Sequence, residues 1–128
     1  MPRNAEDVEN FLYRLNRNFE GENGMFLVSS GTDGPPIAVR VVEPIVVVRV
    51  DIGLIPSDHG KQLELMRKLL EYNGTDLVHA AYALEADEVV LSAGLELESL
   101  DENELAAVLS DIDLALARHV SILRELAS

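Results

Sequence analysis

Three histidines carry the side chain best suited to proton transfer or metal binding near neutral pH: His59, His79 and His119. None has a second histidine or an acid at the His-Glu-x-x-His spacing, which would place two ligands on one face of a helix. Each also falls in a different expected element. The pattern therefore favours His59 at a helix start, His79 on a sheet surface and His119 as a polar residue on a helix flank, with an isolated base or metal ligand as the alternative for His119.

The remaining candidate nucleophiles and phosphate ligands do not match known spacings. The Ser29–Gly31 and Ser92–Gly94 segments lack the G-x-S-x-G frame of a nucleophile elbow. The sequence has no cysteine, so thiolate nucleophiles, disulfides and cysteine-based zinc sites are excluded. Gly31–Gly34 has neither the Walker lysine nor the G-x-G-x-x-G spacing, which favours a hairpin loop over a phosphate cradle.

The acidic residues of the C-terminal region do not form a cation site by spacing. Asp111 and Asp113 lie two residues apart, so they do not face each other on a helix, and Glu104 completes no EF-hand pattern. A solvated helix face explains them better. The sequence thus predicts no catalytic residue, no cofactor and no metal ligand, and a protein that is not an enzyme.

Charge is the strongest feature of the composition. The chain has 10 Lys+Arg against 23 Asp+Glu, a net charge of −13. Residues 1–70 hold 10 acids and 8 bases, whereas residues 71–128 hold 13 acids and 2 bases. Binding to nucleic acid or to an anionic membrane surface requires Lys/Arg density that this chain lacks. The acidity serves either solubility or attraction of a basic partner, since both follow from the same field.

The length of 128 residues is that of one domain, which we expect to span residues 1–128. The N-terminus is charged and has no apolar leader region, and the longest apolar span, residues 44–56, contains Arg49 and Asp51. That span is also shorter than the ~20 residues of a membrane helix. We expect a soluble cytoplasmic protein.

The segment Ile37–Ile55 must form the centre of the fold. Alternate residues from Val46 to Leu54 are apolar, while Arg49 and Asp51 interrupt the opposite parity, as in a half-buried strand. The first half of the segment alternates in the same way, and Glu43-Pro44 separates the two halves because proline lacks a ladder N–H. Two adjacent antiparallel strands are predicted.

The flanking segments supply helices and further strands. Asn4 caps a first helix that carries Val8, Phe11, Leu15 and Phe19 and ends before Gly21. A strand over residues 25–30 and a turn at residues 31–35 follow, and a second helix runs from residue 57 or 58 to Asn73-Gly74. Strands at 77–84 and 89–97 flank a polar loop, and a capping box at 101–104 begins a long final helix. The predicted α+β order is α-β-β-β-α-β-β-α, with a mainly antiparallel sheet packed by helices.

This order of elements resembles the type III secretion chaperone-like fold. The similarity is carried by Leu69–Asn73 closing the middle helix, by Val78–Leu84 leading into Val89–Leu91, and by Leu95–Asp101 before the last helix. The local sequence resembles the YbjN-like branch most, and the CesT-type effector chaperones more distantly. The match spans nearly the whole chain.

The resemblance implies a small, acidic, homodimeric cytoplasmic protein that binds a segment of a client protein on apolar patches, partly by strand addition at a sheet edge. YbjN-like proteins share the fold, and many are thought of as sensory-transduction regulators. The resemblance therefore leaves two functions open. The first is a chaperone-like module for an effector-like client, and the alternative is a regulatory accessory protein with no secretion role.

The expected client-binding residues combine aromatic and apolar side chains from the first helix and the first strand. They are Phe11, Leu15, Phe19 and Phe26, with the outer face of the strands beside them. The alternative is that these residues belong to the core.

The second helix is the expected dimer element, because it carries apolar residues on two arcs. Leu63, Met66 and Leu70 form one arc, and Leu65, Leu69 and Tyr72 form the other. We expect the arc of Leu65, Leu69 and Tyr72 to meet a second protomer. The alternative is a helix buried wholly in its own domain.

Overall fold

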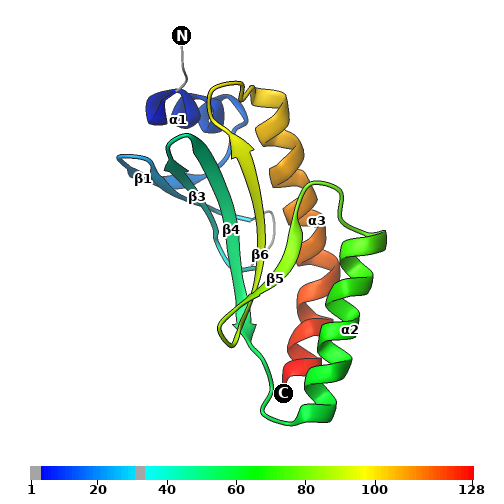
Figure 1. The fold of residues 1–128 in the computed structure, drawn as a ribbon. Coiled ribbons are helices and arrows are strands. Elements are labelled where there is room, and N and C mark those ends of the chain that lie inside the picture. Colours follow the sequence, from blue (N-terminus) through cyan, green and yellow to red (C-terminus); the bar gives the residue numbers. More distant parts are fainter. Residues whose placement is uncertain (1–3, 31–33) are drawn as a thin grey trace.

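The computed structural model describes residues 4–30 and 34–128, which form three helices and one six-stranded antiparallel sheet (Figure 1). The strand order is β1-β2-β3-β4-β6-β5. This arrangement confirms the predicted α+β fold with an antiparallel sheet. The elements in chain order are α1 (Ala5–Arg14), β1 (Phe19–Glu22), β2 (Met25–Val28), β3 (Ile37–Val42), β4 (Ile45–Leu54), α2 (His59–Thr75), β5 (Ala81–Glu85), β6 (Glu88–Glu96) and α3 (Glu102–Ala127).

The two central strands lie where the alternation predicts them. β3 and β4 pair in register, with Val39 opposite Val48, and the turn at Glu43-Pro44 contains a cis peptide bond. Val46, Val48, Val50 and Ile52 are buried as predicted. Leu54 breaks the pattern at 69% exposed, because a register shift between Asp51 and Gly53 separates it from the earlier alternation.

The region after α1 differs from the prediction. The sequence predicted a helix that included Phe19, but α1 ends at Arg14 and Phe19 begins an extra strand, β1. Asn16 has φ 57°, which ends the helix, and Asn23 and Gly24 have φ 56° and 83°. Two successive positive φ angles form the tight turn that joins two strands of a hairpin. The described residues before α2 therefore form four strands, one more than predicted.

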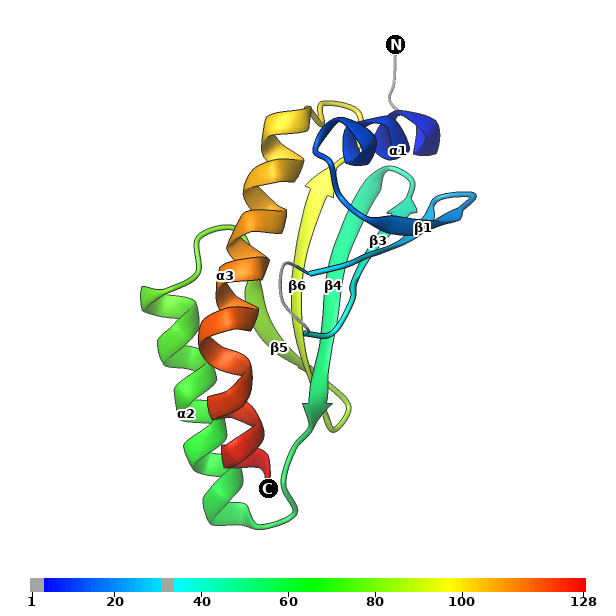
Figure 2. The same cartoon turned by 180° about the vertical axis from the view of Figure 1, so that it is seen from behind.

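The helices cover one face of the sheet. α2 and α3 lie side by side, and α1 lies across the end of the sheet near β1 (Figures 1 and 2). Val8, Phe11 and Leu12 of α1 enter the core. α3 contributes Leu105, Val108, Leu109, Ile112, Ala115, Leu116, His119, Val120 and Leu123.

The predicted helix stop at Asn73-Gly74 is not used, and α2 continues to Thr75. Asn73 instead turns its amide toward β5. Its Oδ1 accepts from the Tyr82 N–H at 2.7 Å, and its Nδ2 donates to the Tyr82 carbonyl at 3.1 Å. The side chain thus replaces a neighbouring strand at this point of the sheet edge.

β5 begins at Ala81 and not at the predicted Leu77. The preceding backbone is held by α3, because Asp111 Oδ2 accepts hydrogen bonds from the N–H groups of Val78, His79 and Ala80 at 3.3, 2.8 and 3.1 Å. These donors therefore bind a carboxylate and not a strand. Asp111, expected on a solvated face, has a structural role.

The turn predicted over residues 31–35 lies partly outside the described residues. The strands on both sides of it, β2 and β3, pair antiparallel with Phe26 opposite Val39. The predicted hairpin between these strands is confirmed.

Candidate functional site

The face of the sheet opposite the helices is hollowed. On β3 and β4 the residues between the buried valines point away from the helices. These alternate residues, which include Arg40, Val47 and Arg49, form the outer face of the sheet. A hollow of about 470 Å³ opens there. It is lined by Met25, Leu27, Pro35, Pro36, Ala38, Arg40, Val42, Val47, Arg49 and Asp51. We call it the sheet groove.

Exposed apolar side chains surround the sheet groove. Met25, Leu27 and Val42 are each 43% exposed. Met25 lies opposite Arg40, and Leu27 lies opposite Ala38. Where β2 pairs with β3, the polar side chain of Arg40 therefore lies among apolar side chains. Clustered apolar surface of this kind is uncommon on a monomer and typically marks a binding site.

The two arginines of the sheet groove have different surroundings. Arg49 Nε donates to Asp51 Oδ1 at 2.9 Å, and its guanidinium also pairs with Glu85. These hydrogen bonds raise the pKa of Arg49. Arg40 is exposed and forms no hydrogen bond or ion pair with any residue in the described part of the chain. The groove thus contains one neutralised and one unneutralised cation.

A second hollow of about 370 Å³ continues the sheet groove toward the hairpin of β1 and β2. The two hollows share Leu27 and Pro36. The second is lined by Asn18, Phe19, Glu20, Leu27, Ser29 and Pro36. The hollowed surface therefore extends from β4 to the outermost strand.

The two edges of the sheet are not equivalent. At β5 the outward backbone groups of Tyr82 are occupied by Asn73. At β1 the Ser29 N–H bonds the Asn18 carbonyl, so in the alternating antiparallel pattern Phe19 and Gly21 direct their backbone groups outward. No residue in the described ranges pairs with these groups. β1 is therefore the edge that can accept another strand.

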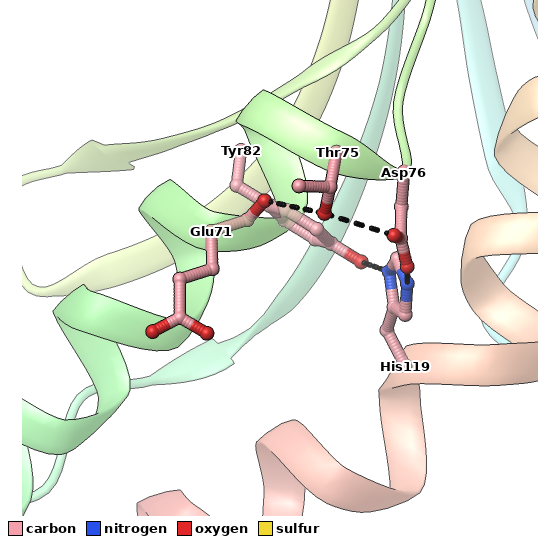
Figure 3. A network of polar contacts seen from close by, with 5 residues as sticks. All are labelled: Glu71, Thr75, Asp76, Tyr82 and His119. Atoms are coloured by element: carbon pink, nitrogen blue, oxygen red, sulfur yellow. Dashed lines mark hydrogen bonds and ion pairs between the residues drawn. The ribbon is translucent and has the colours of Figure 1, made fainter.

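A polar network centred on the buried His119 connects α2, β5 and α3 (Figure 3). The His119 side chain is 2% exposed, and its ring stacks on Tyr72 with centroids 3.5 Å apart. Its Nδ1 lies 2.8 Å from the Tyr82 hydroxyl, and its Nε2 lies 2.8 Å from Asp76 Oδ2. His119 is therefore part of the core and not a flank residue, which corrects the sequence prediction.

The protonation of this network follows from its geometry. The hydrogen bond from His119, followed by that from Thr75, lowers the pKa of Asp76, so the carboxylate accepts from Nε2–H. Nδ1 is then an acceptor, and the Tyr82 hydroxyl donates to it. Burial raises the pKa of the Tyr82 phenol, which keeps it protonated.

The order Tyr82–His119–Asp76 matches the connectivity of a catalytic triad, but its setting does not suit a nucleophile. Tyr82 is 5% exposed, and the hollow beside His119 measures only about 30 Å³. No substrate of ordinary size fits there, since ligand pockets usually span several hundred Å³. The network fastens α3 to the end of α2 and to β5.

The other two histidines are exposed. His59 begins α2, as predicted, whereas His79 lies in the connection before β5 and not on the sheet. Within residues 4–30 and 34–128, no group of three His, Asp or Glu side chains is arranged to hold a metal ion. In the same part of the chain, no helix has the length and apolarity needed to cross a membrane.

The four predicted client-binding residues separate into two pairs. Phe11 and Phe26 are 4% and 1% exposed and belong to the core, which is the alternative considered from the sequence. Both side chains belong to the same buried cluster, which corrects the expectation that they form a surface patch. Leu15 and Phe19 are half-buried, and Phe19 lines the second hollow.

The two arcs of α2 are present, but their surroundings are the reverse of the prediction. Leu65, Leu69 and Tyr72, the predicted dimer residues, are 1%, 5% and 7% exposed because they face the core of their own chain. Leu63 and Leu70 are 72% and 71% exposed. An intermolecular contact of α2 would therefore use the arc of Leu63 and Leu70.

The sequence predicted the outer face of the strands as part of the client surface but did not name the residues of the sheet groove, although the alternation contained the signal. Arg40, Val42, Val47 and Arg49 occupy the parity opposite the core residues in the predicted central strands. Alternate strand positions that hold both valine and arginine predict an exposed face that is partly apolar. The hollow itself also requires β2, whose pairing register the sequence does not specify.

This sheet, with its order of strands and its three helices, is the fold of the type III secretion chaperones. The chain belongs to the CesT_Tir_1 family, whose model matches residues 1–128. The resemblance stated from the sequence is thereby confirmed. No curated protein matches the chain in sequence.

Solved structures from three organisms are similar to this chain. A chain of the ExoU–SpcU complex of the Pseudomonas aeruginosa type III secretion system has a TM-score of 0.71 at 19% identity, covering 89% of this chain and 95% of that one. YbjN of E. coli, a proposed transcription regulator, has 0.63 at 13%, covering 88% of each. The Yersinia pestis chaperone SycH, in complex with a fragment of YscM2, has 0.58 at 19%, covering 88% and 98%. These identities show the fold alone.

Proposed function

We propose that this protein is a non-enzymatic module of the cytoplasm that binds a segment of a client protein. The observation that carries the proposal is the outer face of the sheet, which the helices leave uncovered and which contains the sheet groove of about 470 Å³. Half-exposed Met25, Leu27 and Val42 would lose water on contact with an apolar segment. Phe19 in the adjoining hollow is the predicted client-binding residue that best fits this surface.

The open edge of β1 supports strand addition by the client. An extended segment can bond the outward backbone groups of Phe19 and Gly21 while its side chains reach the adjoining hollow. The comparisons support binding to a protein partner, because similar chains come from a heterodimeric secretion complex and from a chaperone bound to a protein fragment. The effector-like nature of the client rests on these similarities.

We also propose that two copies associate through the outward arc of α2. Leu63 and Leu70 are seven residues apart and so lie on one face of the helix, and both are about 70% exposed. Sedimentation equilibrium tests this. Leu63→Asp with Leu70→Asp should convert a dimer to a monomer, while Leu114→Asp on α3 should not. A wild-type monomer at micromolar concentration would contradict it.

A regulatory accessory protein with no secretion role is the second candidate. The observation that favours it is the structural similarity to YbjN, which is described as a proposed transcription regulator. Such a protein would bind a folded signalling protein or a small ligand and not an extended segment. The acidity of this chain, at net −13, is unfavourable for direct contact with DNA.

Affinity capture from native extract separates the two functions. Tagged wild type and a Leu27→Asp variant are compared at low and raised salt, because salt removes contacts that depend only on charge. Leu114→Asp is the matched control, since Leu114 is 52% exposed on α3 and outside the groove.

The chaperone-like function predicts one salt-resistant client that Leu27→Asp loses and Leu114→Asp retains. The captured segment should be unfolded when isolated, as judged by circular dichroism. Recovery of a partner that is folded on its own would favour the regulatory function. Equal capture by the two variants would remove the sheet groove from the proposal.

A further inference from the structure

Arg40 is an unneutralised cation in the middle of an apolar surface on an acidic protein. It lies between Met25 of β2 and Val47 of β4 in the pairing of the strands. Its side chain is exposed and has no acidic partner among the described residues, although the chain has 23 acids against 10 bases. Arg49, in the same groove, is already paired with Asp51 and Glu85.

We propose that the sheet groove selects client segments in which a carboxylate side chain lies among apolar residues, with Arg40 pairing that carboxylate. This inference rests on the proposed function and adds the chemistry of the segment. The planar guanidinium suits a carboxylate, which it can bind with two parallel hydrogen bonds. The apolar groups around it, Met25, Val42 and Val47, would exclude water from the pair and so strengthen it.

Acidic residues around the sheet groove restrict the favourable position of a client carboxylate to the neighbourhood of Arg40. Glu20 and Glu22 of β1 lie opposite Leu27 and Met25 of the groove lining, and Asp51 lines the groove on β4. An acidic segment that misses Arg40 therefore meets like charge. The net charge of −13 also slows the approach of acidic segments at low salt. The carboxylate is thus favoured at one position of the segment and disfavoured elsewhere.

The test uses three short fluorescent peptides of alternating leucine and serine, with glutamate, glutamine or lysine at the centre. Fluorescence anisotropy measures binding to wild type, Arg40→Ala, Arg40→Glu and the control Arg67→Ala, whose side chain is 82% exposed on α2. Circular dichroism verifies that each variant is folded. Wild type should bind the glutamate peptide about fivefold more tightly than the glutamine peptide, as expected for one partly exposed charged pair.

Arg40→Ala should abolish this preference and leave affinity for the glutamine peptide nearly unchanged. Arg40→Glu should reverse the preference toward lysine, and Arg67→Ala should behave as wild type. Equal binding of the glutamate and glutamine peptides to wild type would overturn the role of Arg40 while leaving the proposed function intact. Absence of binding by all three peptides would count against the groove itself.

A second copy of this chain is the other occupant that the experiment distinguishes. If sedimentation shows a wild-type dimer that Arg40→Glu dissociates, and the peptides compete with dimer formation, then the groove is filled by a second copy. That result would overturn the assignment of the groove to a client segment.

Discussion

Substitution of Tyr82 by phenylalanine isolates one buried hydrogen bond of the polar network. The phenylalanine ring fills the same volume, so the change leaves no cavity at a side chain that is 5% exposed. It removes the donor 2.8 Å from Nδ1 of His119. A buried acceptor without a partner costs about 1–3 kcal/mol, and we expect the free energy of unfolding to fall by this amount.

The assay is urea denaturation followed by far-ultraviolet circular dichroism. The expected loss is measurable because the whole domain is stabilised by about 5–15 kcal/mol. The midpoint should fall while the slope with urea stays constant, since the surface exposed on unfolding does not change. Tyr13→Phe is the matched control, because Tyr13 is 63% exposed and its loss of a hydroxyl should cost less than about 0.5 kcal/mol.

A double-mutant cycle ties the effect to His119. When His119→Leu has already removed the acceptor, Tyr82→Phe should cost at least about 1 kcal/mol less than in wild type. An equal cost in both backgrounds would show that the hydroxyl stabilises the fold in another way. A loss in wild type no larger than that of Tyr13→Phe would refute the hydrogen bond as a stabilising contact.

Three further changes test other parts of the fold. Asp111→Ala should lower the free energy of unfolding by about 1–3 kcal/mol and increase amide exchange in the connection before β5, because three N–H groups lose their acceptor. Asp111→Asn keeps an acceptor oxygen and should therefore retain part of this stability. Gly21→Ala should cost about 2 kcal/mol or more by urea denaturation, because φ is +128° and the new Cβ would lie 2.1 Å from a backbone oxygen, whereas Gly94→Ala meets open space. The hydrogen bond from His119 lowers the pKa of Asp76 in the folded state. The ionised carboxylate therefore contributes to the free energy of unfolding fully above pH about 4, and this contribution is lost as the pH falls through the folded-state pKa. Asp76→Asn should remove that acid dependence from unfolding curves measured between about pH 2.5 and 5.

Local patterns predicted the centre of the fold because its signals are contained within short segments. The alternation of Ile37–Ile55 specifies two strands and their buried parity, and Asp101 caps α3 as its sequence indicates. β1 was missed because Phe19 follows Leu15 at helical spacing, so one residue fits both a helix stripe and a strand. The Asn23-Gly24 pair is the local signal that favours a hairpin over a continued helix.

The polar network could not be predicted from spacing, because its members are distant in the chain. Tyr82 and His119 are 37 residues apart, and Asp76 and His119 are 43 apart. His119 falls at helical spacing from the buried residues Leu116 and Leu123, a signal of burial that the prediction of a flank residue missed, and only the packing of α2 and β5 supplies its partners. Arg40 presents the same difficulty, since its lack of an acidic partner among the described residues depends on every neighbouring strand.

The two halves of the sheet are fixed by different means, and this separates stability from binding. Asn73, Asp111 and His119 fasten β5 to the helices, whereas β1 has an open edge beside the hollows. Tyr82→Phe should therefore lower stability without changing affinity for a client segment, while Leu27→Asp should lower affinity with less than about 0.5 kcal/mol lost in unfolding, because Leu27 is already 43% exposed. Measuring both quantities on both variants tests this separation. If Tyr82→Phe weakens binding as much as Leu27→Asp does, the client must contact or reorder the β5 edge, and the assignment of binding to the β1 half would be wrong.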